Sequence, residues 1–417
     1  MGFNFNLKRA RLLATMLVCQ LLLVAGLALS FPFLALYLHE SRGLPMTQVG
    51  VALALTVALT GIAHFLGGEL CDLRGPKVVM GSALIMRGVG SAAMAWAMWH
   101  SWPAWTIVAL NAAAVFGGNF YEPGVRSWIA ESVPASERLA TYGWLRVALN
   151  IGWALGPAVG GIVAEHSYPL LFIMTAVICW ICATIIILSF SHVAPSRAED
   201  RLSVFAILGV ARDLRFVEFC FYSMLIAIVM GQLVVSLSVH CVGFLGFSKR
   251  EVGWLFSLNG LVVIGVQTAA TVLMRRFRFS VALAVGSVLY AVGYACVGFS
   301  HVFSSMAIAV VVITLGEVIV SPGLPSLATN LAPLRHRGRY VGFHGLCFQT
   351  GSSLAPFLGG IWLEHLSPSW GSGPWIIIAC VGFLASFGFL RLGRLLKPPE
   401  DSVHGCAPVP EETPLAL

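Results

Sequence analysis

The strongest constraint on the fold is an internal repeat. Residues 117–166 align with residues 316–365 at a constant offset of 199 without a gap, and fifteen of the fifty aligned residues are identical. The identities include the run Gly160-Gly161-Ile162, which aligns with Gly359-Gly360-Ile361. Both copies are long apolar segments around a short basic loop. This pattern predicts two similar helix bundles that close around a central site.

The composition indicates that both copies lie in a membrane. The chain has 417 residues, of which 58% are hydrophobic and only 10% are charged. A soluble protein with this balance would expose far too much apolar surface to water. The length accommodates about twelve helices of about 20 residues each, the length that crosses a bilayer. The lipid bilayer is therefore an expected partner.

Twelve apolar stretches can be drawn, and they predict an all-α membrane protein with two pseudo-symmetric bundles of six transmembrane helices. They lie near residues 12–37, 47–70, 78–98, 104–130, 140–164, 169–190, 216–243, 251–274, 279–299, 302–331, 339–363 and 374–396. The predicted organisation is an N-terminal bundle over 1–190, a polar linker over 191–215, a C-terminal bundle over 216–396 and a disordered cytoplasmic tail over 397–417.

The distribution of basic residues predicts the orientation. If the N-terminus is cytoplasmic, the inner segments carry twenty arginines and lysines, whereas the outer segments carry only Arg42, Lys249 and Arg250. The positive-inside rule then places both termini in the cytoplasm. The formal net charge of +7 is accordingly explained by topology, and no nucleic-acid partner is expected. The expected location is a bacterial-type inner membrane, with the protein as a multi-pass monomer.

A glycine motif lies in the fifth apolar stretch. Glycines three and four residues apart clear one helix face, so that a neighbouring backbone can approach closely, and a proline there permits a kink. The motif consists of Gly143, Gly152, Gly156, Pro157, Gly160 and Gly161. Ordinary tight helix packing is the alternative interpretation.

A second motif lies between the second and third stretches, in the sequence GELCDLRGPK over residues 68–77. Its fixed positions are Gly68, Leu70, Asp72, Gly75 and Lys77. Gly75 suits a tight turn, and Asp72 can cap a helix or pair with a base. The corresponding loop of the second half, Arg275-Arg276-Phe277-Arg278, has lost the acid and the glycine.

These two motifs resemble those of the major facilitator superfamily. The glycine motif is similar to the antiporter motif of its twelve-helix, proton-coupled drug exporters. The 68–77 loop is similar to the superfamily's loop signature, with Leu73 and Pro76 in place of its two usual arginines. The resemblance implies that this loop latches the two halves together, with Asp72 as the latch and Glu131 as its charge partner through Lys77 or Arg74. It further implies export of small amphipathic compounds, a multidrug type of efflux, by alternating access.

One departure from that family leaves the proton route open. Drug antiporters of the superfamily commonly carry an arginine midway along the fourth span, but here no base precedes Arg126 near its cytoplasmic end. Proton transfer then follows a different route, or coupling is absent.

Two acids inside the apolar stretches are candidates for that route, because a charge at the bilayer centre costs about 2.5–3.5 kcal/mol. Glu317 stands near the middle of the tenth stretch, in a context that resembles some multidrug exporters. The repeat aligns it with Gly118, so Glu122 lies one turn further inward on the related helix, and both acids are expected to face the cavity. Proton or cation coupling and a structural hydrogen bond are the alternatives for Glu317. For Glu122, an ion pair with Arg146 or Arg126 competes with a transport role.

Arginines and aromatic residues complete the candidate site. Arg87, in the middle of the third stretch, has no acid at helical spacing, so it either pairs with a distant carboxylate or binds an anionic substrate group. The weaker candidates for cavity-lining aromatics, which would suit lipophilic cations, are Phe31, Phe33, Tyr37, Trp144 and Tyr222.

No cofactor or metal is expected. The chain has no G-x-x-x-x-G-K-[ST] loop for a nucleotide. Glu165-His166 and Glu364-His365 repeat at the outer helix ends but supply too few ligands for a metal, and are interpreted as inherited polar pairs.

The predicted function is that of a secondary transporter for a small molecule in exchange for protons. An exporter or facilitator of a specific sugar, amino acid or organic anion is the nearest alternative, favoured by Arg87 and Arg146. A non-transporting receptor is a more remote one. An enzyme is not expected, because no H-E-x-x-H or nucleophile motif is present.

Overall fold

The computed structural model describes residues 7–133, 135–190, 209–274, 276–333 and 337–402, and these form helices without any strand. The N-terminal half contains α1 (Leu7–Leu36) with the π turn η1 (Tyr37–Ser41), α2 (Met46–Arg74), α3 (Pro76–Trp99), α4 (Ala104–Gly118), α5 (Tyr121–Ser132), α6 (Ala135–His166) and α7 (Tyr168–Ser189). The C-terminal half contains η2 (Gly209–Arg212), α9 (Leu214–Gly231), α10 (Val235–Val239) with the π turn η3 (His240–Phe244), α11 (Lys249–Met274), α12 (Phe279–Gly298), α13 (Phe303–Leu331), α14 (Arg337–Leu366) and α15 (Gly373–Leu395).

These helices make the twelve expected spans, because α4 with α5 and α9 with α10 each share one span. Ten of the described helices are long and apolar enough to cross a membrane; α14 and the divided α4–α5 span are not among them. The predicted fold class is therefore confirmed. The greater part of the predicted linker, residues 191–208, lies outside the described residues.

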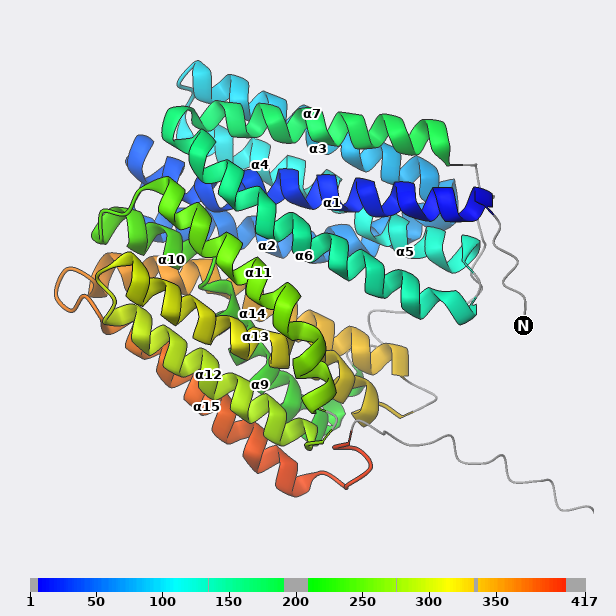
Figure 1. Ribbon diagram of the computed structural model, residues 1–417, viewed down its shortest axis with the longest axis vertical. Helices are drawn as coiled ribbons and strands as arrows, with labels where there is room; N and C mark the ends of the chain where they lie inside the picture. Colours follow the sequence, from blue (N-terminus) through cyan, green and yellow to red (C-terminus); the bar gives the residue numbers. More distant parts are fainter. Residues whose placement is uncertain (1–6, 134, 191–208, 275, 334–336, 403–417) are drawn as a thin grey trace, which may run out of the picture.

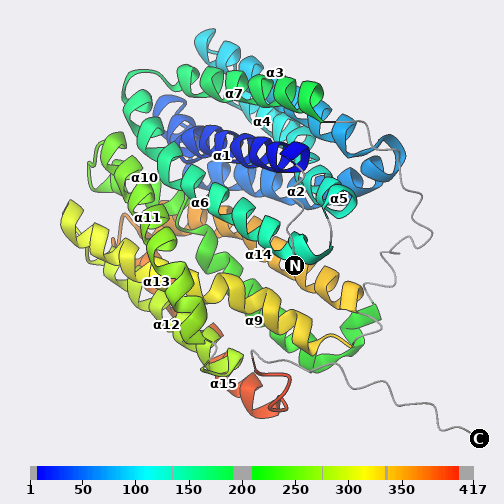
Figure 2. The same cartoon turned by 45° about the vertical axis from the view of Figure 1, so that its right-hand side comes forward.

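The two halves form two bundles that lie side by side. Figure 1 shows α1–α7 in the upper half of the molecule and α9–α15 in the lower half. The bundles contact each other mainly through α6 against α11 and through α2 against α14. We call the end where α1 begins and α15 ends the terminal end, and the opposite end, near α10, the far end (Figure 2).

Repeat-related prolines lie in the fourth span of both halves, but only the first of these spans is divided. Pro123 has no N–H for the carbonyl of Asn119, and the helix stops there, between α4 and α5. Its counterpart Pro322 likewise leaves the carbonyl of Val318 without its helical donor. The Gln267 side chain of α11 donates to that carbonyl at 3.0 Å, and α13 continues unbroken.

The glycine motif positions α6 against two neighbours. A Cβ added to Gly156 would lie 2.5 Å from the carbonyl oxygen of Ala25, and Gly152 and Gly160 press equally closely on the α1 backbone. A Cβ on Gly161 would meet the carbonyl of Lys249 in α11 at 2.5 Å. The predicted close packing is thus present, on α1 within the bundle and on α11 across the interface.

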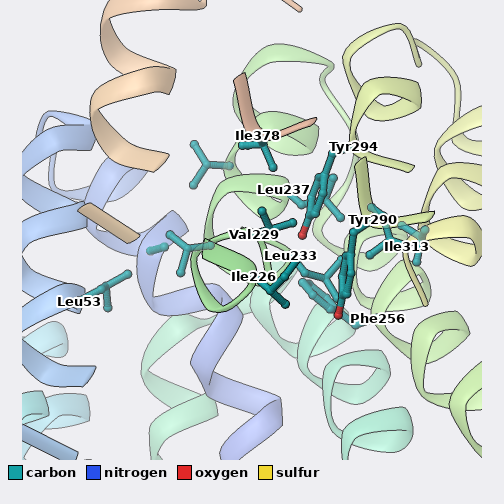
Figure 3. Close-up of a cluster of buried hydrophobic side chains, with 14 of the residues drawn as sticks. Leu53, Ile226, Val229, Leu233, Leu237, Phe256, Tyr290, Tyr294, Ile313 and Ile378 are labelled. Carbon is teal, nitrogen blue, oxygen red and sulfur yellow. The ribbon is translucent and has the colours of Figure 1, made fainter. Parts of the chain in front are cut away.

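The core of the C-terminal bundle is rich in tyrosine. Figure 3 shows Tyr290 and Tyr294 of α12 lying parallel among aliphatic side chains from α9, α10 and α13. Their ring centroids are 6.4 Å apart, and Tyr294 also stacks on Trp375 of α15. All three rings are almost completely buried, which fixes the wall behind the cavity described below.

The prediction of a disordered tail from residue 397 is wrong for residues 397–402. The Asp401 side chain is fully buried and accepts hydrogen bonds from the Ser280 backbone N–H at 2.7 Å and from the Ser280 hydroxyl at 2.6 Å. It also forms an ion pair with Arg278 at 2.8 Å. The tail therefore caps the N-terminus of α12. It also supplies an acidic partner to Arg278, whose basic loop between α11 and α12 has no acid of its own.

Replacing Asp401 with alanine is expected to destabilise the C-terminal bundle by about 2 kcal/mol, because it leaves buried donors of Ser280 without acceptors. The measurement is thermal unfolding of the purified protein in detergent. Asp401→Asn should lose less, since its carbonyl still accepts one hydrogen bond, and Ser402→Ala serves as the neighbouring control. If the Asp401→Ala protein unfolds at the same temperature as the wild type, the cap contributes nothing to stability.

Candidate functional site

Three cavities follow one another through the molecule. The vestibule, of about 400 Å³, lies between the bundles in the half nearer the terminal end and is lined by Gln20, Glu122, Val125, Arg126, Tyr142, Leu145, Arg146, Leu149, Asn150, Val263, Gln267, Glu317 and Ser321. The Glu317 cavity, of about 190 Å³, is lined by residues of α6 and of the C-terminal bundle. The N-bundle cavity, of about 240 Å³, is lined by residues of α1–α4, α6 and α7 together with Asn119.

Shared lining residues show that the three cavities adjoin one another. Leu149, Asn150, Val263 and Glu317 belong to both the vestibule and the Glu317 cavity. Trp153 belongs to both the Glu317 cavity and the N-bundle cavity. The series therefore runs from the terminal end past Glu317 and Trp153 into the N-terminal bundle.

Glu317 lies where the first two cavities meet, in the middle of α13. Its Oε2 accepts a hydrogen bond of 2.9 Å from the Asn259 side chain of α11, and Asn259 also donates to the Thr314 hydroxyl at 2.8 Å. The side chain is half-buried, and no described base lies within ion-pair distance of it. A carboxyl group held by a neutral amide in a cavity is suited to gain and lose a proton.

Glu122 and Arg146 both line the vestibule, as expected, but they do not form an ion pair. Glu122 pairs with Arg126 of its own helix at 3.5 Å, in an exposed arrangement that contributes little to stability. Arg146 reaches across the interface instead and donates to the Ser321 hydroxyl of α13 at 2.9 Å. The vestibule thus carries charges of both signs.

Arg87 extends into the N-bundle cavity from α3. Its only hydrogen bond among the described residues is a long one, 3.4 Å, to the carbonyl of Ala114. Its stem lies against Gly118, where an added Cβ would be 2.8 Å from Nε. The expected carboxylate partner is not found among the described side chains.

The aromatic residues selected from the sequence lie away from these three cavities, with the exception of Phe31. Phe33 and Tyr222 are packed in the core, Tyr37 packs on Tyr168 at the far end, and Trp144 is 61% exposed. The aromatics that line the cavities are Phe31, Tyr142, Trp153, Phe172, Phe256 and Tyr290.

A sequence signal for Trp153 existed. Arg146, Leu149, Asn150 and Trp153 follow one another at spacings of three, one and three residues, and all of them line a cavity. They form one stripe of α6, whereas the glycines of the motif use another face for α1. A stripe drawn along this helix from Arg146 at helical spacing would have predicted that Trp153 lines a cavity.

The loop motif joins α2 to α3 by a tight turn. Gly75 has a φ of +81°, a conformation that favours glycine, and Pro76 begins α3 directly after it. Gly68 has no neighbour within 4 Å of an added Cβ, and Lys77 is half-buried. The side chains of Asp72 and Glu131 lie outside the described part of the chain, so the latch between them stays a prediction.

The far end carries the ion pairs that join the bundles within the described residues. Glu165 of α6 binds Arg250 of α11 at 3.0 Å, and Glu40 of η1 binds Lys249 at 3.6 Å. Glu364 of α14 accepts a hydrogen bond of 2.6 Å from the backbone N–H of Thr47 in α2. The repeated glutamates at the outer helix ends, which the sequence presented as inherited polar pairs, are therefore contacts that close the far end.

Two six-helix bundles, cavities between and within them, and a half-buried acid at their interface define the class of multi-pass secondary transporters. Residues 16–278 and 219–410 match the family model of the Major Facilitator Superfamily. The chain belongs to that family, whose members are transporters and not enzymes.

Relatives and solved structures agree with this assignment. The chain is 25% identical over 384 residues to the multidrug resistance protein MdtH of Edwardsiella ictaluri, covering 88% of this chain and 91% of the relative. It is 24% identical over 376 residues to the uncharacterized MFS-type transporter YttB of Bacillus subtilis, covering 85% and 89%. The fold is similar to that of the nucleoside transporter NupG, with a TM-score of 0.78 at 12% identity and coverage of 91% and 99%. A POT family transporter gives a TM-score of 0.76 at 13% identity, with coverage of 92% and 96%.

Proposed function

We propose that this transporter exports small amphipathic compounds in exchange for protons, by alternating access in an inner membrane. The observation that carries the proposal is Glu317, a half-buried acid between the bundles whose hydrogen-bond partner is the neutral amide of Asn259. The 25% identical relative named as a multidrug resistance protein supports the direction and the substrate class. The glycine motif of α6 supports antiport, through its resemblance to the antiporter motif.

In this proposal Glu317 is the switch between substrate and proton. Ionised, it attracts a cationic group that enters through the vestibule; protonated, it releases that group. Arg146 and Glu122 set the charge of the vestibule, and the 68–77 loop latches the halves when the far end is open. The positive-inside rule places the terminal end in the cytoplasm, so the arrangement described here is open inward and closed outward by the far-end ion pairs.

The test is reconstitution of the purified protein, as a monomer, in liposomes with an imposed pH gradient. Lumenal pH is followed while lipophilic cations, organic anions and sugars are added in turn. Proton flux triggered by cations is the expected result. Substrate movement with no pH response to any of the compounds would contradict proton coupling.

The second candidate is a facilitator for a specific metabolite with an anionic group. The observation that favours it is Arg87, a cation without a carboxylate partner among the described residues, in a mainly apolar cavity that also carries hydroxyl and amide groups. In the same liposomes it would appear as uptake of one anion or sugar that a protonophore does not affect.

A further inference from the structure

The two charged cavities differ in sign and share a wall. The Glu317 cavity holds a carboxyl group from the C-terminal bundle, and the N-bundle cavity holds the guanidinium of Arg87. Among the described residues, Trp153 of α6 is the one that lines both. A molecule that lay along Trp153 and reached into both cavities would have an acid at one end and a base at the other.

Among the described residues, no acid lines the cavity that holds Arg87. A guanidinium at membrane depth is costly unless it is paired, and the described residues supply only the 3.4 Å contact to the carbonyl of Ala114. The same cavity is lined by hydroxyl and amide groups, among which Asn111 donates to Thr56 and Asn119 donates to Thr60, each at 3.3 Å. A carboxylate from outside would satisfy the planar guanidinium with two parallel hydrogen bonds.

The repeat places these two charges in complementary positions. At the offset of 199 residues, Glu317 of α13 corresponds to Gly118, and Arg87 of α3 corresponds to Gly286 of α12. Each half therefore has one charge and one glycine at the contact between its third and fourth spans. Gly118 makes room for Arg87, because a Cβ there would collide with the arginine stem.

We propose that the substrate is amphoteric: a carboxylate bound by Arg87, an ammonium group bound by Glu317 and an aromatic or apolar body against Trp153. This inference rests on the proposed function and narrows its substrate class. The two cavities, each of about 200 Å³, together reach the range of about 300–1,000 Å³ that small-molecule sites occupy. An ammonium group alone would use Glu317 and leave Arg87 unpaired.

The test is equilibrium binding to the purified protein in detergent, without any gradient. The probes are an aryl-substituted amino acid, its methyl ester, which keeps only the ammonium group, and its deaminated acid, which keeps only the carboxylate. The wild type is expected to bind the amino acid at least tenfold more tightly than either analogue, since a hydrogen-bonded charge pair accounts for about ten- to a hundredfold in affinity. Glu317→Gln should abolish the preference over the deaminated acid.

Two variants examine Arg87 itself. In Arg87→Gln, the amino acid and its methyl ester should bind equally, while the affinity for the ester stays within about twofold of the wild type. Gly118→Ala keeps the arginine but displaces it, so the preference should fall there as well. Gly345→Ala, at a position with nothing within 4 Å of an added Cβ, is the matched control and should retain the preference.

Each outcome decides the proposal. Equal binding of the amino acid and its ester by the wild type would overturn it. So would an equal loss of both ligands in Arg87→Gln, because Arg87 would then only support the fold. The proposed function fails independently: a protein that keeps the binding preference but shows no proton flux in liposomes is an amphoteric-substrate transporter without proton coupling.

Discussion

Replacing Glu317 with glutamine is expected to abolish active, proton-driven transport while leaving the fold intact. Glutamine preserves the shape of the side chain and can still accept the hydrogen bond from Asn259, so the contact of α13 with α11 is kept. It can neither release a proton nor attract a cation, and a step that depends on either should slow by at least a hundredfold, equivalent to about 2.7 kcal/mol. Proton flux in liposomes with an imposed pH gradient gives the measurement.

A matched control separates loss of coupling from loss of a negative charge. Glu69 is an exposed acid on α2 that lies outside the three cavities. Glu69→Gln should transport like the wild type. Substrate accumulation against its gradient by the Glu317→Gln protein would contradict the assigned role and move the search to Glu122.

Replacing Gly253 with leucine is the second change with a large expected effect. Gly253 lies at the interface of the bundles, where an added Cβ would collide with the carbonyl oxygen of Pro157 and lie 3.4 Å from Cα of Ala158. Both obstacles are backbone atoms, which cannot move aside as a side chain could. The far end should then be unable to close as it does here, and transport should fall at least tenfold.

Hydrogen exchange distinguishes this mechanism from general damage. In Gly253→Leu, backbone amides of residues 40–50 and 246–254 should exchange faster, because the far-end contacts are lost. Gly265→Leu, on the same helix at a position without a neighbour within 4 Å, should show neither effect. The prediction fails if Gly253→Leu transports normally or if its far end stays protected.

Periodic features of the chain could be predicted because repetition and burial act on many residues at once. The 199-residue repeat and the apolar stretches led to twelve spans in two bundles, and the glycines of α6 led to close helix contacts. Their depth in the membrane alone indicated that Glu317 and Arg87 have a structural or functional role, because a charge there is costly. The linker and the latch pair remain untested.

The features that could not be predicted depend on contacts between distant parts of the chain. Asp401 caps a helix that begins more than a hundred residues earlier, and its tail segment has no periodic pattern. The break at Asn119 was not predicted, and neither was the contact of Gln267 with the corresponding carbonyl of the other half. Aromatic residues were chosen by type, whereas the packing of each helix decides which of them reach a cavity.

The position of α11 gives it a particular importance in how the molecule works. Its Asn259 holds the carboxylate of Glu317, and its Gln267 holds the carbonyl of the very next residue, Val318. The same helix packs along α6 of the other bundle. If Glu317 exchanges protons as proposed, the change in its charge acts first on α11, the helix that packs on the opposite bundle. Protonation and the bundle interface are then separated by one hydrogen bond and one helix.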